Sequence, residues 1–63
     1  MARIRNRLTG TEELFGTVKE ADAALEKWLQ NWQERGCAVL KTADGSYSVS
    51  EPDGRAIGIF DIE

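Results

Sequence analysis

The spacing of apolar residues along the chain changes at Gly36. Between Thr17 and Gly36, apolar residues recur every three or four positions, which is the spacing of one side of an α-helix. After Gly36, apolar and polar residues alternate in short runs separated by Asp-Gly pairs, the pattern of strands joined by tight turns. The pattern therefore predicts one helix followed by a series of antiparallel strands.

The helix is predicted over residues 18–35. Thr17-Val-Lys-Glu20 matches a capping box, in which the Thr hydroxyl and the Glu carboxylate each satisfy a backbone N–H group. Gly36 suits the left-handed residue that ends a helix. Six apolar residues form a stripe about 100° wide, which is predicted to face the core. They are Val18, Ala21, Leu25, Trp28, Leu29 and Trp32. The residues predicted to face water on the opposite side are Ala23, Lys27, Gln30 and Glu34.

Before the helix, residues 2–8 alternate strictly, as in a half-buried strand. One side carries Arg3, Arg5 and Arg7, and the other carries Ala2, Ile4, Asn6 and Leu8. Residues 11–16 fit either a second strand that folds back on the first or a helical turn capped by Thr11. We favour the strand, and we expect Leu14 and Phe15 to be buried in both cases.

After the helix, strands are predicted over residues 37–42, 46–50 and 55–62, with turns at Asp44-Gly45 and at residues 51–54. In the middle strand, Tyr47 and Val49 are predicted to point inward and the three serines outward. The whole chain, residues 1–63, is expected to be a single α+β mini-domain of order β(β)αβββ. It is a two-layer sandwich in which the amphipathic helix packs on one face of a small, mainly antiparallel sheet.

Composition narrows the possible functions. The 63 residues include no His and one Cys, and 8 basic and 11 acidic residues give a net charge of −3. Without His, acid–base catalysis would need a carboxylate, Lys41, Tyr47 or Cys37, and the carboxylates are predicted mostly on exposed helix faces and in turns. We therefore expect no enzymatic activity, no cofactor and no metal site. The lone Cys37 forms no internal disulfide, and neither a signal peptide nor a membrane-spanning run is recognisable, so we expect a cytoplasmic protein that does not bind membranes.

Two candidate binding features lie on the sheet. If Ile4 and Leu8 pack under the helix, the arginine row (Arg3, Arg5 and Arg7) lines the uncovered face, which we call the open face. Such a row is either a solvated strand surface or a contact row for phosphate or carboxylate groups. Ile57 and Ile59 also point away from the core side of the last strand. Either a bulge near Gly58 shifts the register, or these isoleucines lie on the open face and meet a partner or a second copy.

A third candidate is an acidic rim on the helix formed by Glu20, Asp22 and Glu26. Asp22 and Glu26 are like charges one helical turn apart, which is locally unfavourable. The rim is either an ordinary solubilising surface or a contact site for a basic partner.

These features predict a non-enzymatic small acidic protein that acts by occupying a surface of another macromolecule, protein rather than nucleic acid. In size, acidity and layout the chain resembles the small accessory proteins of phages and mobile elements, including anti-CRISPR-type inhibitors, and this resemblance implies an inhibitory role. One alternative is a nucleic-acid-binding module that uses the arginine row. Another is a structural homodimer formed through the Ile57 and Ile59 face or a sheet edge.

Overall fold

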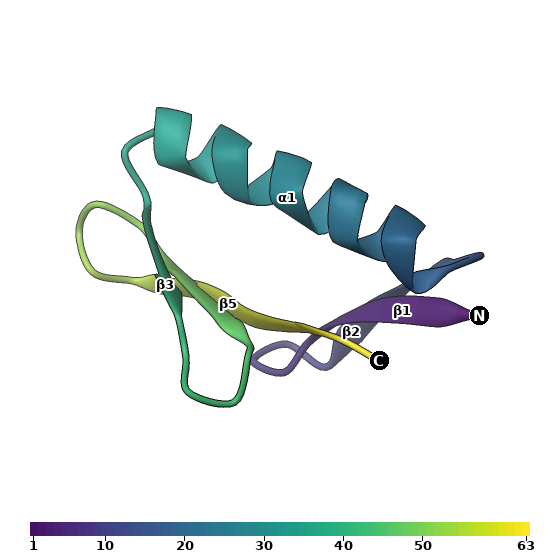
Figure 1. The fold of residues 1–63 in the computed structure, drawn as a ribbon. Helices are drawn as coiled ribbons and strands as arrows, with labels where there is room; N and C mark the ends of the chain where they lie inside the picture. Colours follow the sequence, from purple (N-terminus) through teal and green to yellow (C-terminus); the bar gives the residue numbers. More distant parts are fainter.

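One helix lies across one face of a five-stranded antiparallel sheet (Figure 1). The computed structural model describes all residues, 1–63. Its elements are β1 (Ala2–Asn6), β2 (Thr11–Phe15), α1 (Val18–Glu34), β3 (Ala38–Lys41), β4 (Tyr47–Ser50) and β5 (Ala56–Ile62). The α+β class and the order of strands and helix are confirmed. No helix is both long enough and apolar enough to cross a membrane.

The strands lie in the order β2-β1-β5-β4-β3, and every neighbouring pair is antiparallel. The N-terminal hairpin of β1 and β2 therefore joins the C-terminal meander through the β1–β5 pair. The strand alternative for residues 11–16 is confirmed, because β2 pairs along its length with β1. This order leaves β2 and β3 as the two edges of the sheet.

The ends of α1 lie at the predicted caps, although only the Thr17 half of the predicted capping box forms a hydrogen bond. The Thr17 hydroxyl accepts a hydrogen bond from the Glu20 backbone N–H at 3.1 Å, and Gly36 adopts a φ of +88°. Val18, however, is 60% exposed, so its predicted place in the core stripe is wrong. Helical side chains lean toward the N-terminus, and the side chain of this first residue therefore projects past the start of the helix.

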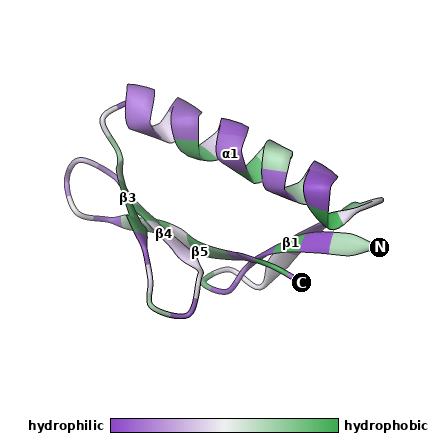
Figure 2. Cartoon of the chain, in the orientation of Figure 1, coloured by the Kyte–Doolittle hydropathy of each residue, from purple (hydrophilic) through white to green (hydrophobic).

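The core lies between α1 and the sheet, and the apolar side of the helix faces the strands (Figure 2). Its six buried apolar residues are Ala2, Ile4, Ala21, Leu25, Val49 and Phe60. Trp28 and Trp32 pack against this cluster, with ring centroids 6.4 and 5.1 Å from that of Phe60. The two tryptophans thus close the core between the helix and the central strand β5.

Two expectations about burial are wrong in the N-terminal hairpin. Leu14 is 61% exposed, because it lies opposite Arg3 and shares its face, while the neighbouring Phe15 points toward α1 and is half-buried. Adjacent strand residues face opposite sides, so both could not be buried under one helix. Leu8 is 51% exposed, because β1 ends at Asn6 and Leu8 falls in the following loop rather than under the helix.

The turn between β3 and β4 gives a further correction. Ser46 was expected to point outward with the other serines, but it is 1% exposed. Its backbone N–H donates to the Asp44 carboxylate at 3.1 Å, and its carbonyl accepts from the Thr42 N–H at 2.8 Å. Ser46 is therefore buried because it closes the turn.

A β-bulge interrupts the pairing of β4 with β5. Val49 pairs with Gly58 and Ser50 pairs with Ala56, which leaves Ile57 as the extra residue. Of the two alternatives for this strand, the bulge near Gly58 is confirmed. It turns the Ile57 side chain against the core cluster, whereas Ile59, opposite Ser48, stays on the open face.

Candidate functional site

The open face carries the arginine row as predicted. Ala2, Ile4 and Asn6 alternate with the arginines in β1 and are buried on the helix side. The opposite side of β1 therefore presents Arg3 and Arg5 to the uncovered face of the sheet, and Arg7 follows just past the end of the strand. This position alone does not show whether the guanidinium groups are free to bind a ligand.

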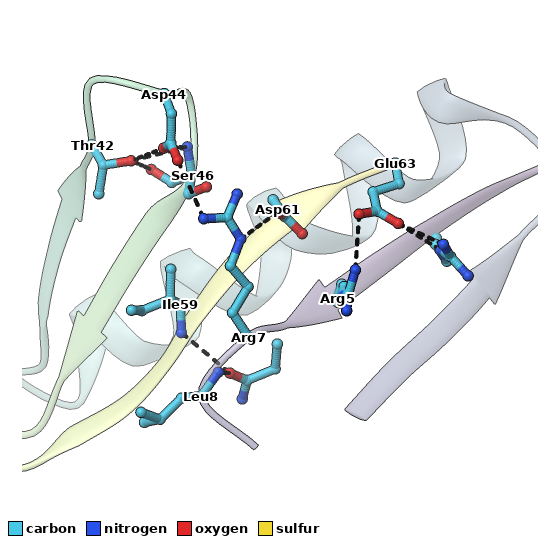
Figure 3. A network of polar contacts seen from close by, with 11 residues as sticks. Arg5, Arg7, Leu8, Thr42, Asp44, Ser46, Ile59, Asp61 and Glu63 are labelled. Carbon is cyan, nitrogen blue, oxygen red and sulfur yellow. Dashed lines mark hydrogen bonds and ion pairs between the residues drawn. The ribbon is translucent and has the colours of Figure 1, made fainter. Parts of the chain in front are cut away.

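Carboxylates of the same chain already occupy the arginine row (Figure 3). Arg3 lies 2.7 Å from the Glu63 carboxylate and 3.2 Å from that of Glu12. Arg5 contacts the other oxygen of Glu63 at 3.2 Å. The seven residues that make these and the following contacts form what we call the arginine–carboxylate ladder. They are Arg3, Arg5, Arg7, Glu12, Asp44, Asp61 and Glu63.

Arg7 bridges two carboxylates at the other end of the ladder. Its Nε donates to Asp61 at 2.7 Å, and its Nη1 donates to Asp44 at 3.3 Å. Asp44 is placed by the β3–β4 turn, where its carboxylate also accepts hydrogen bonds from the Thr42 hydroxyl and the Ser46 N–H. The bonds from Thr42 and Ser46, with a smaller contribution from Arg7, hold the pKa of Asp44 far below its ordinary value.

Strand register brings the ladder together. Arg5 lies opposite Glu12 on β2 and opposite Asp61 on β5. The pairing continues to Arg3 and Glu63, whose backbone groups exchange hydrogen bonds at 3.1 and 2.9 Å. Hydrogen bonds from Arg3 and then Arg5 lower the pKa of Glu63. Hydrogen bonding to Glu63 raises the pKa of Arg3, and hydrogen bonding to Asp61 raises that of Arg7.

The ladder changes what the arginine row offers to a ligand. Three arginines face four carboxylates, so the ladder carries a net charge of −1. A phosphate group that approached the row would meet these carboxylates and would have to displace them from the guanidinium groups. Affinity for nucleic acid depends on basic side chains that are free to neutralise phosphates. The open face therefore offers weak support for binding of a polyanion.

The predicted apolar cluster on the open face does not form. Of the two isoleucines, Ile59 lies on this face and is half-buried, while Ile57 packs against the core. The large exposed apolar side chains of the face are at the sheet edges, Leu14 on β2 and Leu40 on β3, which are 61% and 67% exposed. Because the ladder and the β4 serines lie between them, they do not form one contiguous patch.

The structure divides the acidic rim of the helix. At 100° per residue, Glu20 is about 160° from Asp22 and about 120° from Glu26 around α1. Its carboxylate lies against Gly16, where an added Cβ would be 3.3 Å from Glu20 Oε2. Asp22 and Glu26 lie together on the opposite flank, which faces β3 and β4. None of the three carboxylates has an ion-pair partner within the chain.

Beside Asp22 and Glu26, a groove of about 530 Å³ separates α1 from β3. We call it the α1–β3 groove. It is lined by Ala23, Glu26, Lys27, Leu29, Gln30 and Gln33 of the helix, Val39 of β3 and Tyr47 of β4. A smaller adjoining hollow shares Glu26, Leu29 and Tyr47 with it and extends to Asp22 and Leu25. The two carboxylates therefore border a hollow that polar and apolar side chains line together.

Sequence reasoning identified the arginines but missed their acidic partners. Asp61 and Glu63 have the same two-residue spacing as Arg5 and Arg3, a match that antiparallel pairing of the first and last strands would have revealed. The sequence contained no indication of the groove, because it predicted Tyr47 only as an inward-facing strand residue and assigned no direction to Val39. The opposite position of Glu20, in contrast, follows from helical geometry alone.

The fold and these surfaces define a small α+β domain with a charge-paired open face and a groove beside its helix that Asp22 and Glu26 border. No three His, Cys, Asp or Glu side chains lie close enough together to hold a metal ion. In comparisons with known proteins, no family model, no curated protein and no solved structure matches the chain.

Proposed function

We propose that this chain is a non-enzymatic binding protein that covers a basic surface of another protein with the flank of α1 that carries Asp22 and Glu26. The observation that supports the proposal is a difference in ion pairing between the sheet and this flank of the helix. The arginine row is paired with carboxylates of the chain, whereas Asp22 and Glu26 have no ion pair and border the α1–β3 groove.

The energetics of the helix favour a partner at this position. Asp22 and Glu26 are one turn apart, and like charges at this spacing destabilise a helix. Cations of a partner placed between them would turn this repulsion into attraction, and complementary charge would also speed association. Binding of a cationic partner would therefore relieve the repulsion between Asp22 and Glu26 that destabilises the free helix.

More specifically, we propose an inhibitory or accessory role in the cytoplasm. It is supported by the small size and acidity of the chain and by its resemblance in general character to accessory proteins of phages and mobile elements. A protein of this kind acts by blocking a surface that another macromolecule needs. The nucleic-acid-binding alternative loses its main support, because Arg3, Arg5 and Arg7 are engaged within the ladder.

Affinity capture with matched variants tests the proposal. The immobilised protein, a D22K/E26K variant and an E20K/E34K control are exposed to a lysate of the organism that encodes the chain. Both variants reverse two exposed charges on α1, but only the first alters residues that line the groove or its adjoining hollow. We expect a protein partner, identified by mass spectrometry, that D22K/E26K loses and E20K/E34K retains, with far-ultraviolet circular dichroism confirming that both variants fold.

Two results would contradict the proposal. One is capture that nuclease treatment abolishes, which would indicate that nucleic acid is the ligand. The other is equal capture by the protein and D22K/E26K, which would show that the acidic flank makes no contact.

A further inference from the structure

β3 has free backbone hydrogen-bonding groups along its outer side. The Thr42 N–H donates to the Ser46 carbonyl at 2.8 Å, and this bond identifies which residues of β3 direct their main-chain groups toward β4. In an antiparallel pair, alternate residues point their main-chain groups toward the partner strand. Leu40 therefore bonds to β4, while Val39 and Lys41 point their N–H and C=O groups away from the sheet. Such an edge is a template for one more strand.

The same two residues direct their side chains toward the helix layer. Val39 lies opposite the buried Val49, and the Lys41 ammonium lies 5.8 Å from the ring centroid of Tyr47. A strand added beside β3 would follow this alternation, so every second side chain would enter the α1–β3 groove. In this binding mode, backbone hydrogen bonds supply affinity and the groove selects side chains.

The length of the groove fits a short strand. From Asp22 to Gln33 the helix advances about 16 Å at 1.5 Å per residue. Five extended residues span about 17 Å at 3.4 Å each. β3 begins near the C-terminal end of α1, and Lys41, at the other end of β3, borders with Asp22 a separate hollow beside the β3–β4 turn. The two ends of the groove are therefore an amide end near Gln33 and an acidic end near Asp22 and Lys41.

The side chains of the groove indicate what the strand would carry. Leu29, Val39 and Tyr47 contribute the apolar part of the groove lining. Asp22 and Glu26 offer carboxylates without ion pairs within the chain, Lys27 also lines the groove, and the nearby Lys41 lies over the Tyr47 ring. An apolar side chain at one position and a Lys or Arg two residues before it in an antiparallel strand would match this order.

We propose that an extended basic segment of a partner protein pairs with the edge of β3 and lies in the α1–β3 groove. Its apolar side chain packs on Leu29 and Val39, and its Lys or Arg reaches Asp22 and Glu26. The inference rests on the proposed function and names the kind of segment that the acidic flank recognises.

A peptide titration tests this inference on the full chain. The probe is the acetylated and amidated peptide Thr-Arg-Thr-Val-Thr-Val, and its control has Glu in place of Arg. With ¹⁵N-labelled protein, we expect the Arg peptide to shift the backbone amide resonances of Val39 and Lys41. The D22N/E26Q variant should raise its Kd roughly threefold to tenfold, because two exposed ion pairs are lost. The E20Q control, altered on the other flank, should leave the Kd unchanged.

Backbone pairing is tested separately. Lys41→Pro removes an outward-pointing N–H without removing a bond to β4, and Pro is tolerated at such edge positions. We expect Lys41→Pro to lose binding and Lys41→Thr to keep it. A peptide that is N-methylated at the Arg and the first Val provides the same test without altering the protein, and it too should not bind.

Three outcomes would overturn the inference. The first is equal affinity for the Arg and Glu peptides, and the second is unchanged binding of the N-methylated peptide. The third is a set of β3 amide shifts that depend on protein concentration in the absence of peptide, because a second copy of the chain would then occupy the edge. Capture of a partner that requires Asp22 and Glu26 but survives Lys41→Pro would reject the strand pairing and leave the proposed function intact. Loss of that dependence on Asp22 and Glu26 would reject both.

Discussion

The side chain of Asn6 lies directly over Gly58, and this contact predicts a severe effect of Gly58→Ala. A Cβ at position 58 would lie 2.5 Å from Asn6 Nδ2 and 2.8 Å from its Cγ. Asn6 cannot easily turn away, because its Oδ1 accepts hydrogen bonds from the Leu8 N–H at 3.0 Å and the Ile59 N–H at 3.2 Å. The new methyl group must therefore displace a buried side chain that two backbone donors hold in place.

The cost follows from these contacts. Overpacking of this kind costs about 1–3 kcal/mol, and each weakened hydrogen bond about 1 kcal/mol. The smaller conformational entropy of the unfolded Ala chain returns about 0.4–1 kcal/mol. We expect Gly58→Ala to lower the free energy of unfolding by about 2–4 kcal/mol, against a total of about 3–9 kcal/mol for a domain of this length. The corresponding fall in Tm is about 10–30 °C.

Urea denaturation followed by the fluorescence of Trp28 and Trp32 measures this change. A double-mutant cycle with Asn6→Ala tests the cause. Asn6→Ala alone leaves the Leu8 and Ile59 N–H groups without their acceptor and destabilises the protein, but it also makes room for a methyl group at position 58. N6A/G58A should therefore be more stable than the sum of the two single changes predicts. A Gly58→Ala variant within 0.5 kcal/mol of the natural protein, or strict additivity, would refute the reasoning.

Three further predictions concern charge and assembly. Because the pKa of Glu63 is lowered in the folded protein, Glu63 stabilises the fold above its unfolded pKa of about 4.3, and this stabilisation is lost as the pH falls through the lower folded value. The urea midpoint should therefore fall over that pH range in the natural protein and should fall less in E63Q. D61N/E63Q changes the charge of the ladder from −1 to +1 and should increase DNA binding in mobility-shift assays at low salt; strong, salt-dependent binding by the unaltered protein would contradict the masking of the arginines. Sedimentation at high micromolar concentration should show a monomer, since the groove proposal requires a free β3 edge, and a dimer would favour pairing between copies.

Local patterns predicted most of the secondary structure. The Thr17 cap, the apolar stripe and Gly36 delimited α1, because helix formation depends on neighbours within one or two turns. Alternation in β1 likewise predicted which side of the strand carries the arginines. Val18 is exposed because the side chain of the first helical residue projects past the start of the helix. Leu14 is exposed because adjacent strand residues face opposite sides, so only Phe15 can lie under the helix. A periodic pattern identifies a side of an element, but it does not show whether another element covers that side.

The sequence by itself determined the class of fold, the ends of the helix and the side of β1 that carries the arginines. Only the tertiary structure decided that Arg3, Arg5 and Arg7 meet carboxylates 54 to 60 residues away, and that a groove beside β3 lies next to the acidic flank. The reason is physical. Local conformation follows from contacts between near neighbours, whereas ion pairs across strands depend on sheet order and register, which the packing of the whole chain selects.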